Sequence, residues 1–140
     1  MGTNNILPAK FRLDEYIVSD TVIRLTGNKI GNNLQFGIDP EGKFDKEGKK
    51  FVLTLHIIVC DDEKNLDLSM TIKGIFEYDT DNMDELKSFL CINAPAILFP
   101  YIRAYISNVT ALGGMKPLIL PTLNIEGVGR DLLNKMSACQ

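Results

Sequence analysis

Two neighbouring segments alternate apolar and other side chains so regularly that they constrain the whole fold. In residues 51–60, every odd position from Phe51 to Val59 is apolar, and in residues 66–78 the even positions are almost all apolar. A period of two residues is typical of a β-strand with one buried face. The intervening residues 61–65 are polar, so the two strands are predicted to form a hairpin within an antiparallel sheet.

Two further strands are predicted upstream of this hairpin. Residues 11–25 are rich in apolar and β-branched side chains, but their alternation changes phase, which favours a long strand with a bulge or bend. Leu34, Phe36 and Ile38 alternate with other residues and predict a second strand. Residues 27–33 and 40–50 are rich in glycine and polar side chains and are predicted to be loops.

After Tyr78 the apolar period lengthens to the three or four residues of a helix. Residues 79–85 are acidic, as suits a helix N-terminus, and a long helix is expected over residues 93–112, ending at Gly113 and Gly114. An apolar loop with two prolines follows, and residues 124–136 predict a short last helix. The expected fold is α+β in one domain over residues 1–140: a four-stranded antiparallel sheet, a long helix, an apolar crossover loop and a short C-terminal helix. Residues 1–10 are expected to be flexible.

The long helix is apolar on more than one side. One stripe contains Ala94, Leu98, Tyr101, Tyr105, Val109 and Leu112, and a second contains Ile97, Ile102 and Ile106. Two stripes need two burial partners: the sheet and, most simply, a second subunit, although the sheet and the last helix of one chain are an alternative. The residues expected at an oligomer interface are Ile97, Tyr101, Tyr105, Ile106 and Val109.

Two prolines lie within this region. Pro95 is expected near a helix start, where its missing N–H costs nothing. Pro100 inside a helix costs about 3 kcal/mol, so the helix is expected to start in stages or to bend there.

Composition and motifs exclude several functions. A net charge of −3 and a pI of about 5.1 argue against nucleic-acid binding. The N-terminus lacks a signal-peptide pattern, and Pro100, Arg103 and Asn108 interrupt the apolar runs, so a membrane span is not expected. Three scattered cysteines suit a reducing compartment, and the protein is expected to be soluble and cytoplasmic.

No set of residues suggests catalysis or a cofactor. His56 is the single histidine, on a strand, and is interpreted as structural or surface-exposed. The acidic residues 79–84 lack the glycine that a calcium loop needs. The chain is therefore not expected to be an enzyme, and no metal or cofactor is expected.

The notable feature is an apolar segment in a loop. Residues 113–123 have the glycines and prolines of a loop, yet they carry several large apolar side chains: Met115, Leu118, Ile119, Leu120 and Leu123. An apolar surface loop favours a binding site. The alternative is a lid that folds back over the core, and both hold if the loop walls a groove.

At these residues the sequence resembles the SecB protein-export chaperone family. Ala94-Pro95 followed by Ile97-Leu-Phe-Pro-Tyr-x-Arg103 is similar to the family signature, as is the spacing to Gly113 and to Leu120-Pro-x-x-Asn124. The resemblance covers about residues 11–136. It implies an ATP-independent chaperone that holds unfolded precursor polypeptides in apolar grooves and assembles as a dimer of dimers.

The resemblance places the client groove between the sheet, the crossover loop and the following helix. The residues expected there are Leu34, Phe36, Met115, Leu118, Leu120, Leu123, Val128 and Leu132. Broad apolar contact with adaptable methionine side chains suits a site that accepts many sequences.

The sequence departs from the family at the surface that docks the SecA motor ATPase. Asp20 falls at one position of the acidic patch that other members use, but Arg24 and Ser69 stand at two others. Loss of two acids weakens steering toward a basic partner. SecA docking is therefore in doubt, and a SecB-like chaperone dedicated to one labile partner, such as an antitoxin, is the alternative.

Overall fold

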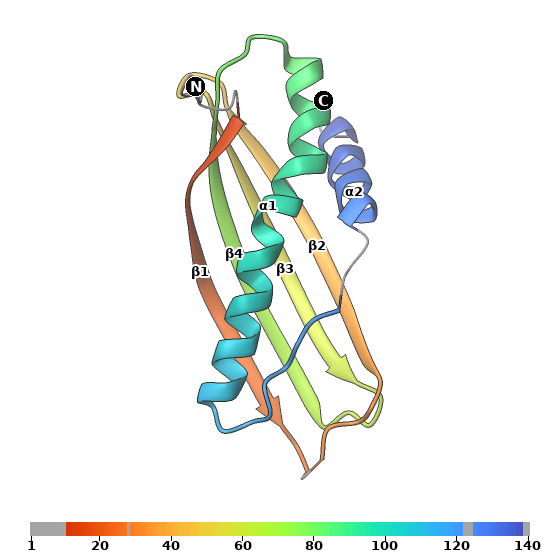
Figure 1. The fold of residues 1–140 in the computed structure, drawn as a ribbon. Coiled ribbons are helices and arrows are strands. Elements are labelled where there is room, and N and C mark those ends of the chain that lie inside the picture. The colour runs from red at the N-terminus through yellow and green to blue at the C-terminus, as the bar shows by residue number, and fades with distance from the viewer. Residues whose placement is uncertain (1–10, 28, 122–124, 139–140) are drawn as a thin grey trace, which may run out of the picture.

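The computed structural model describes residues 11–27, 29–121 and 125–138 of the 140-residue chain. Its elements are the strands β1 (Phe11–Leu25), β2 (Leu34–Asp45), β3 (Lys50–Asp61) and β4 (Leu66–Tyr78), then the helices α1 (Met83–Leu112) and α2 (Ile125–Ala138). The strands form one antiparallel sheet in the order β1-β4-β3-β2. Both helices lie on one face of this sheet, and α2 runs back beside the N-terminal half of α1 (Figure 1). The predicted α+β architecture is confirmed.

The core lies between the helices and the alternating face of β3 and β4. The fully buried side chains include Phe51, Leu53, Val59, Ile72 and Phe76. Gly74 interrupts the apolar positions of β4 because a Cβ there would lie 2.9 Å from Leu98 Cδ1 of α1. The glycine therefore lets the long helix approach the sheet closely.

The phase changes in β1 correspond to irregularities in its pairing with β4. The register shifts between Leu13 and Glu15 and again between Val18 and Asp20. The predicted bulges are confirmed, and they bring Tyr16 and Thr21 onto the helix side of the sheet, where both contact α1.

The loop predicted over residues 40–50 is mostly wrong. β2 continues to Asp45, which pairs with Lys50, so only a short turn joins β2 to β3. Phe44 packs on Phe51 with ring centroids 4.9 Å apart, which extends the apolar alternation beyond Ile38. Pro40 is tolerated because β2 is an edge strand, where a strand can lack one N–H donor.

The long helix begins at Met83, inside the acidic segment 79–85 that predicted a helix start, and runs on through the stretch expected over residues 93–112. It spans 30 residues from Met83, and the Asn82 side chain caps it by accepting a hydrogen bond from Glu85 N. Pro95 is therefore an interior residue rather than a residue of the first turn. Figure 1 shows the helix bent along its length, as two interior prolines require.

The carbonyl that Pro95 leaves without a helical donor faces α2. A proline removes the hydrogen bond to the residue four positions earlier, which here is Cys91. A Cβ on Gly129 of α2 would lie 2.5 Å from the Cys91 oxygen, so the two helices touch backbone to backbone at this point. Gly129 is buried between the two helices, and the close contact leaves no room there for a larger residue.

By length and composition, α1 would suffice to cross a membrane, contrary to the expectation from its interrupting residues. Its buried side chains recur at every fourth position along the sheet: Leu86, Leu90, Ala94, Leu98, Ile102 and Ile106. A core helix passes the same test, and the packing of these side chains on the sheet accounts for the apolar composition.

Candidate functional site

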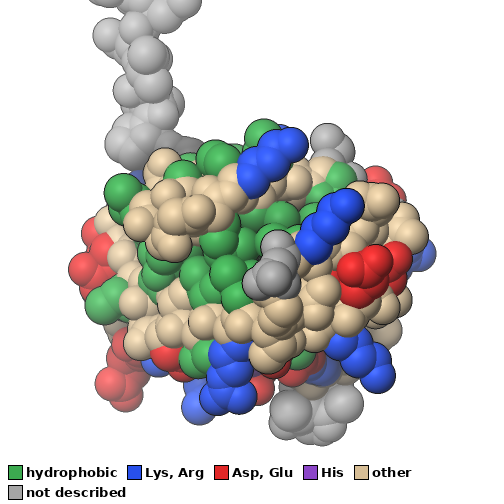
Figure 2. All heavy atoms as spheres, turned by 90° about the horizontal axis from the view of Figure 1, so that it is seen from below, with side chains coloured by type: hydrophobic (Ala, Val, Ile, Leu, Met, Phe, Trp, Pro, Cys, Tyr) green, Lys and Arg blue, Asp and Glu red, His purple; other side chains and the backbone are tan. Residues whose placement is uncertain are grey.

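Three of the residues predicted to bind clients meet in one cavity. Leu34, Met115 and Leu118 line a hollow of about 680 Å³ at the end of the sheet where the β1–β2 loop, the β3–β4 turn and the crossover segment come together. We call this hollow the loop cavity. Figure 2 views the molecule from that end and shows hydrophobic side chains gathered near the centre of the face.

The crossover segment forms one wall of this cavity and is also a lid over the core. Leu118 and Leu120 point inward and are buried, whereas Ile119 between them is 68% exposed. Leu118 N donates to Thr110 Oγ1 at 3.0 Å, and Ser107 Oγ donates to Leu118 O at 2.9 Å. These bonds fix the segment on α1, so it folds back over the core and walls the cavity at the same time.

The remaining predicted groove residues do not share this surface. Leu120 and Leu132 are buried in the core, while Phe36 and Val128 are half-buried and pack against it. Leu123 lies outside the described residues. Of the predicted groove residues that the structure describes, Leu34, Met115 and Leu118 line the loop cavity, and the others lie in or against the core.

A buried carboxylate holds the rim of the loop cavity. Asp61 accepts hydrogen bonds from the backbone N–H of Gly31 at 2.7 Å, Asn65 at 2.8 Å and Leu66 at 2.9 Å. These bonds, that from Gly31 first, lower the pKa of Asp61 below its usual value. One side chain thus joins the β1–β2 loop to the β3–β4 turn.

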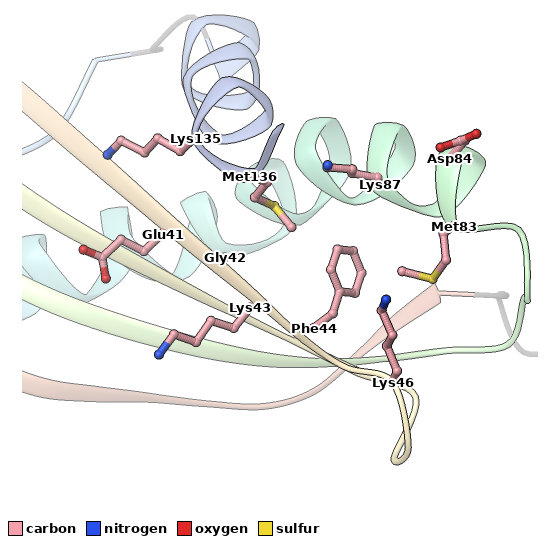
Figure 3. Close-up of a pocket in the computed structure, with 10 residues that line it drawn as sticks. All are labelled: Glu41, Gly42, Lys43, Phe44, Lys46, Met83, Asp84, Lys87, Lys135 and Met136. Carbon is pink, nitrogen blue, oxygen red and sulfur yellow. The ribbon is translucent and has the colours of Figure 1, made fainter. Parts of the chain in front are cut away.

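A second and larger cavity lies at the opposite end and was missed by sequence reasoning. It measures about 820 Å³ and is lined at the end of β2, the start of α1 and the end of α2. Its apolar lining is Phe44, Met83 and Met136, and the side chains of Lys46 and Lys87 stand at its rim (Figure 3). We call it the methionine cavity.

The methionine cavity has a firm apolar floor. Phe44 packs against Phe51 and meets the ring of Tyr78 edge-on at 5.9 Å. Met136 crosses β2 at Gly42, where a Cβ would lie 3.0 Å from the Met136 sulfur. Behind Met136 lies Cys91, and burial raises the pKa of its thiol to about 11.

The sequence signal for Phe44 was present, because Phe44 continues the even-numbered alternation of Leu34, Phe36 and Ile38.

The predicted interface residues of α1 lie mainly beside β1. Ile97, Tyr101, Tyr105 and Val109 recur at every fourth position, next to the buried stripe. The Tyr101 ring lies 4.5 Å from that of Tyr16, and the Tyr105 hydroxyl is 2.6 Å from Thr21 Oγ1.

This flank remains partly open to solvent. Tyr16 is 44% exposed and Tyr101 is 42% exposed. The prediction that Ile106 lies at an oligomer interface is wrong. Its side chain is fully buried against the sheet of its own chain, so it does not reach this flank.

The residues considered for motor docking lie on the opposite face of the sheet. Asp20 is exposed and pairs across the strands with Thr71, while Arg24 pairs with Asp67 and Ser69 with Val22. Exposed Ile17, Val22 and Ile58 share this face. The face is thus a mixture of charges, hydroxyls and apolar side chains.

His56 also lies on this face. Its Nδ1 is 3.1 Å from Thr71 Oγ1, and its Nε2 is 3.9 Å from a Glu41 oxygen. Within the described part of the chain, no group of three or more His, Cys, Asp or Glu side chains is placed to hold a metal ion.

The described residues thus form an α+β fold with a cavity at each end of the sheet, and each cavity has large apolar side chains in its lining. The family model of the preprotein translocase subunit SecB matches residues 33–134, which is most of the chain. The protein therefore belongs to the SecB family, a family of chaperones.

Two relatives share part of its sequence. An uncharacterized protein of Methanocaldococcus jannaschii is 34% identical over 124 residues, which is 85% of this chain and 74% of that protein. The protein-export protein SecB of Cereibacter sphaeroides is 36% identical over 73 residues. That second match spans 52% of this chain and 44% of the export protein, less than half of its length.

A solved structure has the same fold. It is the SecB-like chaperone of Mycobacterium tuberculosis in complex with a ChAD peptide from the HigA1 antitoxin. The TM-score is 0.69 at 16% identity, over 82% of this chain and 88% of the other. At that identity the likeness shows the fold alone.

Proposed function

We propose that this protein is an ATP-independent chaperone that binds unfolded polypeptides through its apolar cavities and keeps them competent for export. The observation that carries the proposal is the loop cavity, in which Leu34, Met115 and Leu118 meet in a chain of the SecB family. Apolar contact of this kind accepts many sequences because it demands no fixed polar geometry.

Binding of an extended client needs more than one contact along the client chain. Ordering a flexible polypeptide costs conformational entropy, so a single small cavity binds weakly. Two cavities at opposite ends of one subunit, repeated in an oligomer, supply the avidity that offsets this cost.

The proposal includes a homo-oligomer, in which the exposed flank of α1 and β1 is covered by other copies. The flank is apolar, with Tyr16, Ile97, Tyr101 and Val109 along it, and Leu112 at its end is 88% exposed. β1 is also an edge strand, with one side of its backbone unpaired by the described strands. A dimer of dimers in the cytoplasm is the assembly we propose.

A second candidate is a chaperone dedicated to one labile partner. The mixed outer face favours it, because Arg24 and Ser69 interrupt the acidic surface that a basic motor would seek. The SecB-like chaperone of Mycobacterium tuberculosis was solved with an antitoxin peptide, so a protein of this fold binds a segment of one such partner. In this case SecA does not dock, and generic unfolded chains are ignored.

Client binding tests the proposal. A reduced, slowly folding precursor and its folded form are titrated with the protein, and binding is followed by fluorescence anisotropy. We expect binding to the unfolded form alone. Capture of a single partner, with generic unfolded chains ignored, would favour the dedicated chaperone instead.

A paired substitution locates the site. We expect Met115→Asp with Ile119→Asp to weaken client binding about ten-fold, or about 1.4 kcal/mol, because the first charge enters the cavity wall and the second replaces an exposed apolar side chain beside it. Ile58→Asp, on the outer face of the sheet and also exposed, is the matched control and should bind as the wild type does. Equal binding by all three proteins would show that the loop cavity does not hold the client.

A further inference from the structure

The methionine cavity combines an apolar floor with a positively charged rim. In Figure 3 the ammonium groups of Lys46 and Lys87 point toward the space between Phe44, Met83 and Met136. The carboxylates of Glu41 and Asp84 also belong to the lining, but they point away from that space (Figure 3). A local positive field therefore stands over apolar side chains in a chain whose net charge is −3.

The two rim lysines are available to a ligand. Lys49, Lys50 and Lys135 each have a carboxylate partner within 4.0 Å. Lys46 and Lys87 have none among the described residues.

The one carboxylate next to Lys46 in the chain is engaged elsewhere. Asp45 accepts a hydrogen bond from Gly48 N at 3.2 Å within its own turn. Lys135 is held away from the cavity, since its ammonium donates to Asp39 and, at 3.1 Å, to Pro40 O. Among the described residues, therefore, no carboxylate forms an ion pair with Lys46 or Lys87.

The lining supplies a defined anchor contact as well as charge. Phe44 is fixed by its two aromatic neighbours, whereas the thioethers of Met83 and Met136 can adapt to side chains of different shape. A volume of about 820 Å³ is ample for one large apolar side chain with the backbone on either side of it.

We propose that the methionine cavity anchors a client at a large apolar side chain flanked by aspartate or glutamate. The apolar side chain fills the space above Phe44, and the flanking carboxylates pair with Lys46 and Lys87. The inference rests on the proposed chaperone function and assigns it a client class: unfolded segments in which apolar and acidic residues alternate.

The loop cavity at the other end does not repeat this charge pattern. Lys29 and Lys116 line it, but Asp61 accepts a hydrogen bond from Gly31 N of the same lining, and the Asp62 carboxylate lies beside Gly31. The preference for acidic flanks is therefore assigned to the methionine cavity alone.

Three peptides of one length test the charge preference. Each carries a central Leu-Phe anchor, flanked on both sides by Glu, Gln or Lys. Two ion pairs at a solvent-exposed rim predict about three- to ten-fold tighter binding of the Glu peptide than of the Gln peptide. Binding of the Lys peptide should be the weakest, and the differences should shrink as salt is raised.

Two variants assign the preference to the methionine cavity. Lys46→Gln with Lys87→Gln should remove most of the difference between the Glu and Gln peptides and leave Gln-peptide binding unchanged. Arg24→Gln with Lys73→Gln makes the same change in net charge on the outer face of the sheet and should leave the difference intact.

Met83→Glu gives an independent check that does not depend on removing a lysine. Met83 is the first residue of α1, where a carboxylate is favoured by the helix dipole, so the variant should fold. The new carboxylate enters the cavity lining, and the Glu peptide should then bind more weakly than the Gln peptide.

The outcomes separate this inference from the proposed function. Equal binding of the three peptides by the wild type overturns the client class while the chaperone function stands. An equal loss of preference in the outer-face control overturns the assignment to this cavity. Failure of every peptide and every unfolded protein to bind overturns both proposals.

Discussion

The two cavities are built in different ways, although both are apolar and both carry lysines. The loop cavity is walled by turns and by the crossover segment, which are held in place by side-chain hydrogen bonds of Asp61 and Thr110. The methionine cavity is formed at the ends of β2, α1 and α2, which are held by packing. The first should therefore respond to changes in hydrogen bonding, and the second to changes in helix packing.

Gly129→Ala should have the largest effect, and only at the methionine cavity. The added methyl group would lie 2.5 Å from the Cys91 carbonyl oxygen, so α2 must move away from α1. We expect the free energy of unfolding to fall by up to about 3 kcal/mol, which is the cost of overpacking a buried site. Urea denaturation measures the change, and displacement of Met136 should be seen in its methyl NMR signal.

Gly127→Ala is the matched control on the same helix. A Cβ at Gly127 meets nothing within 4 Å, so the substitution should stabilise the helix by up to about 1 kcal/mol through lower backbone entropy in the unfolded chain. A stable Gly129→Ala protein would contradict the close contact between the two helices.

Thr110→Val should loosen the loop cavity by a smaller amount. Thr110 is buried, and its hydroxyl both donates to Ile106 O at 2.7 Å and accepts from Leu118 N. Valine keeps the shape but leaves the Leu118 N–H without a partner, which costs about 1–2 kcal/mol. Hydrogen exchange at the Leu118 amide should accelerate, while amides of α2 near Met136 should not change. Equal acceleration at both ends would show that the cavities are not independent.

The sequence predicted the parts of this molecule that depend on local periodicity. The alternation in β3 and β4, the phase changes of β1 and the crossover segment were all found where expected. Loop-like composition misled at residues 40–45, because the packing of Phe44 on Phe51 outweighs the turn preference of proline and glycine.

Periodicity does not show which side chains pack against one another, so this aspect of the structure was not predicted. Ile106 and Tyr105 are neighbours in the chain, yet one lies in the core and the other borders β1, since successive side chains of a helix with about 3.6 residues per turn point to different sides. The methionine cavity depends on three distant segments that meet only after folding, so periodicity could not show that Met83, Phe44 and Met136 come together. The lysine rim was missed for the same reason.

Acid should weaken the loop cavity and not the methionine cavity. This is the smallest of the expected effects, because it occurs only at low pH. The pKa of Asp61 is lowered in the folded state, so its hydrogen bonds stabilise the protein above its unfolded pKa of about 3.9. That contribution is lost as the pH falls through the lower folded value.

Below that pH, a protonated Asp61 no longer holds Gly31 and Asn65 as a charged acceptor. Amides of the β1–β2 loop should then exchange faster, whereas those around the methionine cavity should keep their protection. Asp61→Asn should abolish this part of the pH dependence between about pH 2 and 5, because an amide does not titrate. If the variant and the wild type lose stability in parallel over this range, another carboxylate is responsible and Asp61 is not the acid-sensitive tie of the loop cavity.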